Sequence, residues 1–210
     1  MLNWIHSWLA HEDAMESVDL LFVLAGLQGR KEYGLKLFQE GSARQLLFSV
    51  GRFEIRKFPK LNIPGSPDLL ALAKDIPPAR RHFFVLFCRD QFNVKRIPVR
   101  RLGTLNEIDA LADWLLLHPE VSSLLIVSSG SHLRRLRLCG RALLSDKLVI
   151  RLRRIPPNYA IGNEDGLRKA VQTLRETLLE LLKILCYALI LPVWKVLRRR
   201  RSVTLVSLNQ

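Results

Sequence analysis

Two short apolar runs, each closed by a glycine, constrain the fold of this chain more than any other feature. The first is Val18–Ala25, followed by Gly26, and the second is Gln45–Val50, followed by Gly51. An apolar run of this length that ends at a turn residue is typical of a strand buried on both faces. Between them, Arg30–Glu40 has the apolar spacing of a helix. This order predicts a βαβ unit with two parallel strands.

Strands and helices continue to alternate along the rest of the chain. Further strands are predicted at His82–Cys88, Val94–Val99, Ser122–Ser128 and Lys147–Leu152. Helices are predicted at Thr104–Leu117, at Ser131–Leu144 and, inside the proline-rich stretch 52–81, at Asp68–Lys74. The alternation predicts an α/β fold, a Rossmann-like three-layer sandwich with a mainly parallel sheet.

The chain is expected to consist of three parts. Residues 1–17 have the pattern of a short amphipathic helix, residues 18–164 carry the Rossmann-like domain, and residues 165–210 form a C-terminal helix with a basic tail. This last helix is expected from about Asp165 into Leu197, and Pro192 is predicted to bend or end it.

The second half of the C-terminal helix is unusual. Ile184–Trp194 carries no charge, lies between Lys183 and Lys195, and is followed by the cluster Arg198–Arg201. Eleven residues are fewer than the roughly 20 that a bilayer-spanning helix needs. The pattern suits either a helix at an anionic membrane surface or a helix packed on the domain with a solvated basic tail.

Composition narrows the partners and the compartment. The chain holds 33 Lys and Arg against 19 Asp and Glu, a formal net charge of +14, which favours anionic partners. The cysteines Cys88, Cys139 and Cys186 form no CxxC pair, and the five histidines form no short ligand pair, so no metal site is predicted. Residues 1–19 lack the pattern of a cleaved signal peptide. We therefore expect a cytoplasmic protein, which could also be peripheral on the inner face of the plasma membrane.

Ligands in such folds bind beyond the carboxyl ends of the strands, which directs attention to the loops there. After the first strand, Gly26 lets the backbone approach a ligand and Arg30 brings a guanidinium to a helix start. After the second strand, Ser49 presents a hydroxyl before Gly51. A tight turn with a surface arginine explains the same residues without a ligand.

A later segment offers a carboxylate to the same edge. Thr104 and Glu107 have the spacing of a capping box at the start of a helix. Glu107 is predicted either to complete that box, or to accept a ligand hydrogen bond or act as a base.

The most informative loop follows the strand Ser122–Ser128. Ser128, Ser129, His132 and Arg135 place hydroxyls, an imidazole and a guanidinium at one helix start, where free amides and the helix dipole favour an anion. Ser129 or Ser131 is a candidate cap for this helix. The alternative is a capped helix whose histidine bonds a neighbouring loop.

This loop resembles the Thr-Ser-x-x-His-x-x-Arg signature of the YdcF-like family, a bacterial domain of unknown function whose relatives include SanA and ElyC. Ser128 stands in the threonine position, and Ser129, His132 and Arg135 match. The resemblance extends to the first strand with Arg30, to the Ser49–Gly51 turn, to the segment 103–107, and to the closing helix with Glu180, Lys183 and Tyr187. The stretch 52–100 departs from the family pattern.

The resemblance implies a domain that binds a phosphate- or nucleotide-bearing ligand, with a role in bacterial cell-envelope and cell-wall (peptidoglycan) biogenesis. Gly26, Arg30, Ser49, Gly51, Thr104, Ser128, Ser129 and Arg135 would hold the ligand. If chemistry occurs, His132 is the general acid–base candidate because its ordinary pKa is close to neutrality, and Glu107 is the second candidate. The sequence names neither a cofactor nor a reaction, and it leaves the oligomeric state open.

Two other functions fit parts of the sequence. A non-catalytic module that docks on a membrane through the C-terminal apolar helix and Arg198–Arg201 fits the end of the chain. Weak, non-specific nucleic-acid binding fits the seven arginines and one lysine of 133–154, although no aromatic stacking residues or nucleic-acid motif accompany them.

Overall fold

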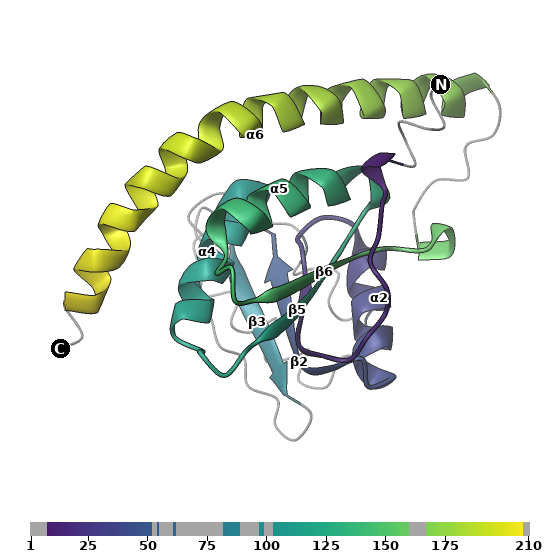
Figure 1. Cartoon of the computed structure of the whole chain (residues 1–210). Helices are drawn as coiled ribbons and strands as arrows, with labels where there is room; N and C mark the ends of the chain where they lie inside the picture. Colours follow the sequence, from purple (N-terminus) through teal and green to yellow (C-terminus); the bar gives the residue numbers. More distant parts are fainter. Residues whose placement is uncertain are drawn as a thin grey trace.

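The computed structural model describes residues 8–51, 54, 61, 82–88, 97–98, 103–159 and 167–207. Figure 1 shows a twisted sheet between helical layers, with one long helix lying across the outside of the domain. The elements are β1 (Val18–Val23), α2 (Gln28–Gln39), β2 (Ala43–Val50), β3 (Phe83–Cys88), β4 (Ile97–Pro98), α4 (Thr104–Leu116), β5 (Ser123–Ser128), η3 (Gly130–His132), α5 (Leu133–Leu143), β6 (Val149–Arg154), η4 (Pro157–Tyr159) and α6 (Leu167–Ser207).

The sheet is mainly parallel, as the sequence predicts. Its strand order is β4-β3-β2-β1-β5-β6. β1 pairs in parallel with β2 and β5, and β5 pairs in parallel with β6, whereas β3 and β4 run antiparallel to their neighbours. From β1 the chain proceeds first to one side and later, at β5, to the other. The strand order therefore reverses between β1 and β5, and the crevice expected for a ligand lies at their carboxyl ends.

Apolar side chains alternate between two cores, one on each face of the sheet. On one face, Leu21 and Val23 of β1 pack with Tyr33 and Leu37 of α2. On the other face, Leu20 and Phe22 of β1 pack beneath α4 and α5, and Leu191 of α6 joins this cluster. The alternation follows from the two-residue period of a strand, and it makes β1 the central, fully buried element.

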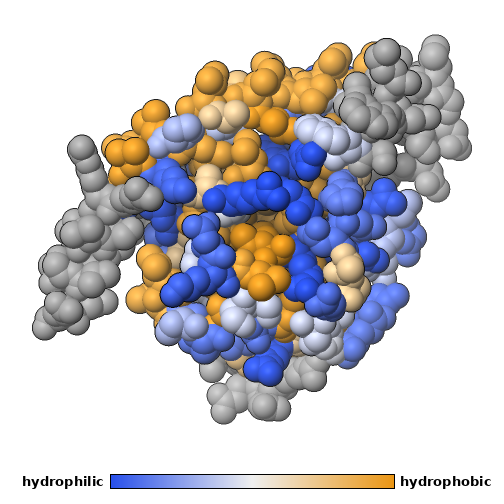
Figure 2. All heavy atoms as spheres, viewed as in Figure 1, coloured by the Kyte–Doolittle hydropathy of each residue, from blue (hydrophilic) through white to orange (hydrophobic). Residues whose placement is uncertain are grey.

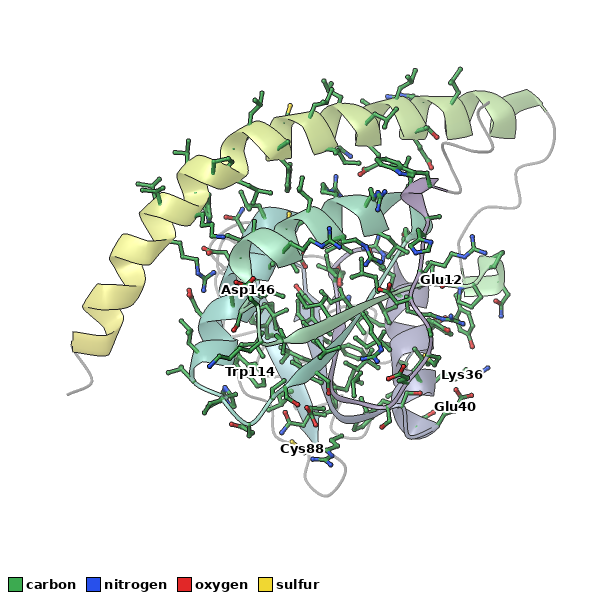
Figure 3. The ribbon with its side chains drawn as sticks, viewed as in Figure 1. Glu12, Lys36, Glu40, Cys88, Trp114 and Asp146 are labelled. Carbon is green, nitrogen blue, oxygen red and sulfur yellow. The ribbon has the colours of Figure 1, made fainter. Side chains whose placement is uncertain are left out.

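The free edge of the sheet at β6 is covered by an acidic segment rather than by another strand. The backbone N–H of Asp13 donates to the carbonyl of Leu152 at 3.0 Å, and the Asp13 carboxylate accepts from the N–H of Leu152 at 2.8 Å. Glu12, labelled in Figure 3, accepts from the N–H of Arg154 at 3.3 Å. These bonds satisfy backbone groups that an open edge would leave exposed.

Most strand and helix positions match the sequence prediction within two or three residues, and the main difference is α6. This helix is 41 residues long and continues through Pro192 to Ser207, so the prediction that it would stop near Leu197 is wrong. Figure 1 shows α6 bowed, with its convex side away from the domain, so the proline is accommodated within the helix.

Other predictions are only partly tested. Within 1–17, helix is present at Trp8–Leu9 and absent from 11–17, and residues 1–7 lie outside the described part. The helix predicted at Asp68–Lys74 and most of the strand predicted at Val94–Val99 also lie outside it.

Two helical glycines provide a test of how closely helix and sheet pack. A Cβ on Gly34 of α2 would lie 2.4 Å from Val23 Cγ2, whereas a Cβ on Gly140 of α5 would meet its nearest neighbour at 3.5 Å. Alanine is favoured over glycine inside a helix by about 1 kcal/mol, but overpacking costs about 1–3 kcal/mol. Gly34→Ala is therefore expected to lower the free energy of unfolding and Gly140→Ala to raise it, as measured by urea denaturation. Equal effects of the two substitutions would contradict the close approach of α2 to β1.

Candidate functional site

The carboxyl ends of β1 and β5 bring together polar residues that are far apart in the sequence. Arg30 is the centre of this cluster. It lies in the first turn of α2 and is buried, with its Nη1 donating to the carbonyl of Ala25 at 2.7 Å. Its Nε and Nη2 donate to Ser129 Oγ at 3.2 and 2.8 Å. The guanidinium thus connects the end of β1 with the loop after β5.

Glycine conformation shapes the turn between β1 and Arg30. Gly26 has φ of 129°, a backbone conformation that residues other than glycine rarely adopt. Its N–H donates to Glu54 Oε1. Gly51 lies against the same carboxylate, since a Cβ there would be 2.8 Å from Glu54 Oε1. The glycines after β1 and β2 therefore leave room for Glu54 at the crevice.

His132 lies beside Arg30 and is held neutral. Arg30 Nη2 is 3.2 Å from His132 Nδ1, and because a guanidinium only donates, Nδ1 accepts and the ring proton is on Nε2. Nε2 faces Glu180 Oε1 at 3.4 Å. Burial, with the charges of Arg30, Arg135 and Lys183, lowers the pKa of His132 from 6.5 to about 3. The ring is therefore uncharged near neutral pH, and its role as a general acid–base remains a prediction.

Arg135 connects the start of α5 with α6. Its Nη1 lies 2.9 Å from Glu180 Oε2 and 3.2 Å from Glu180 Oε1, and Lys183 Nζ donates to the same carboxylate at 2.8 Å. The Tyr187 ring lies under the Arg135 guanidinium, with 5.6 Å from Cζ to the ring centroid. Arg135 and Glu180 are both almost fully buried, so this ion pair fastens α6 to the domain at the crevice.

Glu107 points towards the carboxyl ends of β1 and β2 and takes no part in a capping box. The cap position of α4 falls on Gly103, which has φ of 137°, and Thr104 is the first helical residue. Glu107 Oε1 instead accepts from the N–H of Ala25 at 2.9 Å and from Ser49 Oγ at 2.6 Å. The predicted capping box is therefore wrong, and Glu107 ties α4 to the ends of β1 and β2. Burial raises the pKa of this carboxyl.

Two members of the cluster, Lys31 and Glu54, were not predicted from the sequence. Lys31 Nζ forms an ion pair with Glu54 Oε2, and the lysine side chain is almost fully buried. Burial lowers the pKa of Lys31. Lys31 directly follows Arg30 at a helix start, a signal that was available. Glu54 lies in the stretch that departs from the family pattern, and only the tertiary structure places it here.

Three buried polar atoms at the site have no hydrogen-bond partner among the described residues. Two of them can donate, Ser128 Oγ and Arg135 Nε, with Ser128 0% and Arg135 6% exposed. The third, Glu180 Oε2, can only accept and lies 2.9 Å from Arg135 Nη1 in the ion pair. The start of α5 also lacks a side-chain cap, as does the start of η3, so the predicted capping by Ser129 or Ser131 is wrong. Unsatisfied buried groups of this kind are rare and are expected to receive a ligand or water.

The site residues named from the sequence thus converge, with Thr104 at their margin. Gly26, Arg30, Ser49, Gly51, Glu107, Ser129, His132 and Arg135 are linked directly or through Ala25, Glu54 and Glu180. Thr104 is buried one turn before Glu107. Within the described part of the chain, no three metal-ligand side chains lie together.

A separate hollow lies near the amino ends of β5 and β6, at the other end of the strands from the candidate site. Its volume is about 610 Å³, and it is bounded by the ends of α4 and α5 and by Lys195 and Arg198 of α6. None of the predicted site residues lines it, so it belongs to a different region of the surface.

Comparison of the chain with protein-family models, with curated proteins and with solved structures gives no match.

The low pKa of His132 makes a prediction for stability against pH. Between its ordinary value of 6.5 and its native value of about 3, the unfolded chain binds a proton that the native protein does not. Native stability is therefore lost as pH falls through this window, by at most about 1.4 kcal/mol per pH unit.

His132→Asn keeps an acceptor for Arg30 and removes the titration. The unfolding free energy of the wild type minus that of the variant is expected to decrease as the pH is lowered from 6.5 towards 3. The measurement is urea denaturation of both proteins at each pH. Parallel stability curves for the two proteins would show that His132 is not held neutral.

Proposed function

We propose that the chain binds an anionic, phosphate- or nucleotide-bearing small molecule at the carboxyl edge of its sheet. The observation that carries this proposal is the pair of unpartnered buried atoms, Ser128 Oγ and Arg135 Nε, beside an uncapped helix start. A hydroxyl and a guanidinium N–H both donate to phosphate oxygens.

The balance of charge supports an anion. The basic groups around the crevice are Arg30, Lys31, Arg135 and Lys183, and the carboxylates are Glu54, Glu107 and Glu180. An incoming anion would therefore meet four basic groups and three carboxylates.

We further propose that the chain is a YdcF-like domain protein with a role in bacterial cell-envelope biogenesis. The family-like residues Ser129, His132 and Arg135 surround the point where the ligand is proposed to bind, and Arg30 contacts two of them. Glu180, Lys183 and Tyr187 of the closing helix meet Arg135 there. Residues that carry the resemblance thus lie in contact with one another, which favours a shared ligand site.

In this proposal His132 orients groups rather than transferring protons. Its neutral ring accepts from Arg30 and presents Nε2–H towards Glu180, so it positions the guanidinium from which an anion would accept. Glu107 likewise fixes Ser49 and the backbone of Ala25. The arrangement supports ligand binding and assigns no reaction.

A small ligand is favoured over nucleic acid because the arginines of 133–154 are largely engaged within the chain. Arg135 pairs with Glu180, and four of the other six pair with the acidic segment before β1 through the bridges Arg137–Asp13, Arg151–Glu16, Arg153–Glu12 and Arg154–Glu12. Phosphate backbones would have to displace these carboxylates to use the same cations.

Ser128→Ala separates ligand binding from folding. Removing a buried hydroxyl that has no partner is expected to leave the stability of the free protein unchanged or slightly higher. Loss of a hydrogen bond to a charged ligand costs about 1.5–3 kcal/mol, so affinity is expected to fall by roughly 10- to 100-fold.

The measurement is thermal shift followed by calorimetric titration with phosphate, pyrophosphate, nucleotides and sugar nucleotides. Arg137→Gln is the matched control, because it removes an α5 arginine that pairs with Asp13 outside the crevice. Equal ligand affinity in wild type and Ser128→Ala would overturn the site, and no stabilisation by any of these anions would overturn the ligand class.

A further inference from the structure

The outer face of α6 carries a continuous apolar stripe that is open to solvent. Its members are 40–78% exposed and recur every three or four residues: Leu174, Leu178, Leu182, Leu185, Leu189, Val193 and Val196. Figure 2 shows this face as hydrophobic spheres along the top of the molecule, over α6. Contiguous exposed apolar surface of this kind marks an interaction site.

The opposite face of the same helix is fixed to the domain at two points. Near the start, buried Glu180 pairs with Arg135. Near the end, Arg198 donates to the Asp109 carboxylate at 2.6 Å and to Asp113 at 2.7 Å. Between these points Leu191 is buried in the core cluster beneath α6. The helix is therefore held lengthwise along the domain.

This attachment decides between two ways of meeting a membrane. By length and composition the segment Leu174–Arg198 is able to cross a bilayer. Crossing would break the ion pairs of Arg135 and Arg198 and would place Glu180 in hydrocarbon, where a charged side chain is expensive. A helix that keeps its contacts with the domain instead lies in the plane of the interface, with its apolar face in the acyl boundary.

Charge indicates the kind of surface. The uncharged segment Ile184–Trp194 lies between the exposed lysines Lys183 and Lys195, and Arg198–Arg201 follow. Basic residues that flank an apolar helix face are attracted to anionic lipid headgroups, to which long lysine side chains can extend. The net charge of +14 also favours an anionic surface.

The spacing of the stripe excludes a left-handed coiled coil between two copies of the chain. From Leu174 to Val196 the stripe advances 22 residues in six steps, about 3.7 residues per step, whereas a left-handed coiled coil requires 3.5 and a right-handed one about 3.7. The stripe thus stays on one side of an ordinary α-helix, as contact with a flat surface requires.

We propose that the outer face of α6 docks the domain on an anionic bilayer, with the helix lying along the membrane surface. The convex middle of the bowed helix (Figure 1) carries the most exposed members, Leu185 at 64% and Leu189 at 78%. These side chains enter the acyl boundary while Lys195 meets the headgroups. The Arg135–Glu180 pair then lies on the membrane-proximal side of the domain. This docking does not depend on the anion site.

The test is co-sedimentation of the full chain with vesicles of phosphatidylcholine, with or without phosphatidylglycerol. Leu185→Ser with Leu189→Ser is expected to weaken binding to the mixed vesicles by roughly 10- to 100-fold. The matched control is Leu116→Ser with Leu117→Ser, which removes two leucines of similar exposure, 61% and 68%, at the end of α4. The control is expected to bind as wild type does.

The electrostatic part is tested separately. Lys195→Gln is expected to reduce binding to the mixed vesicles about fivefold, and omission of phosphatidylglycerol to reduce it further. Equal binding to both kinds of vesicle would overturn the anionic preference.

Two results would overturn the docking mode. An alkaline carbonate wash is expected to release the protein from the vesicles, and retention would mean that the helix crosses the bilayer. Sedimentation without lipid is expected to give the same mass for wild type and the Leu185/Leu189 double variant. A wild-type dimer that the double variant abolishes, with no vesicle binding by either, would make the stripe a contact between copies.

Discussion

Compensation of buried charge at the carboxyl edge of the sheet is the constraint on which the rest of the structure depends. Arg30, Glu107, Arg135 and Glu180 are all almost fully buried, and an unpaired buried charge is strongly destabilising. Each finds its partners in a distant part of the chain: Arg30 at Ser129 and His132, Glu107 at Ala25 and Ser49, and Arg135 at Glu180. These contacts hold α2, α4, α5 and α6 in one arrangement around the ends of β1 and β5.

The same pairing gives α6 two different faces. Glu180 and Leu191 lie against the domain, whereas Leu185 and Leu189 project from it. A helix of mixed composition thereby becomes a structural element on one side and an exposed apolar surface, our proposed membrane contact, on the other. The Arg135–Glu180 pair joins the two roles, because it belongs both to the crevice and to the attachment of the helix.

Much of the fold could be predicted because local patterns are strong where strands are buried. The apolar runs closed by Gly26 and Gly51 became β1 and β2, and the rule that ligands bind beyond parallel strand ends correctly selected loops that meet. Predictions of local polar contacts were less successful. The capping box of Thr104 and Glu107 did not form, because Glu107 is drawn to the N–H of Ala25 and to Ser49 across the crevice, bonds that sequence spacing does not reveal.

The sequence by itself determined the class of fold, the polar residues that follow the buried strands, and the apolar and basic character of the last helix, since each follows from residue type and spacing along a single segment. The tertiary structure alone decided the protonation of His132, the partners of the buried arginines, the arrival of Glu54 at Lys31, and which face of α6 is open. Those properties depend on burial and on the distance between charges, which are set only when segments remote in sequence come together.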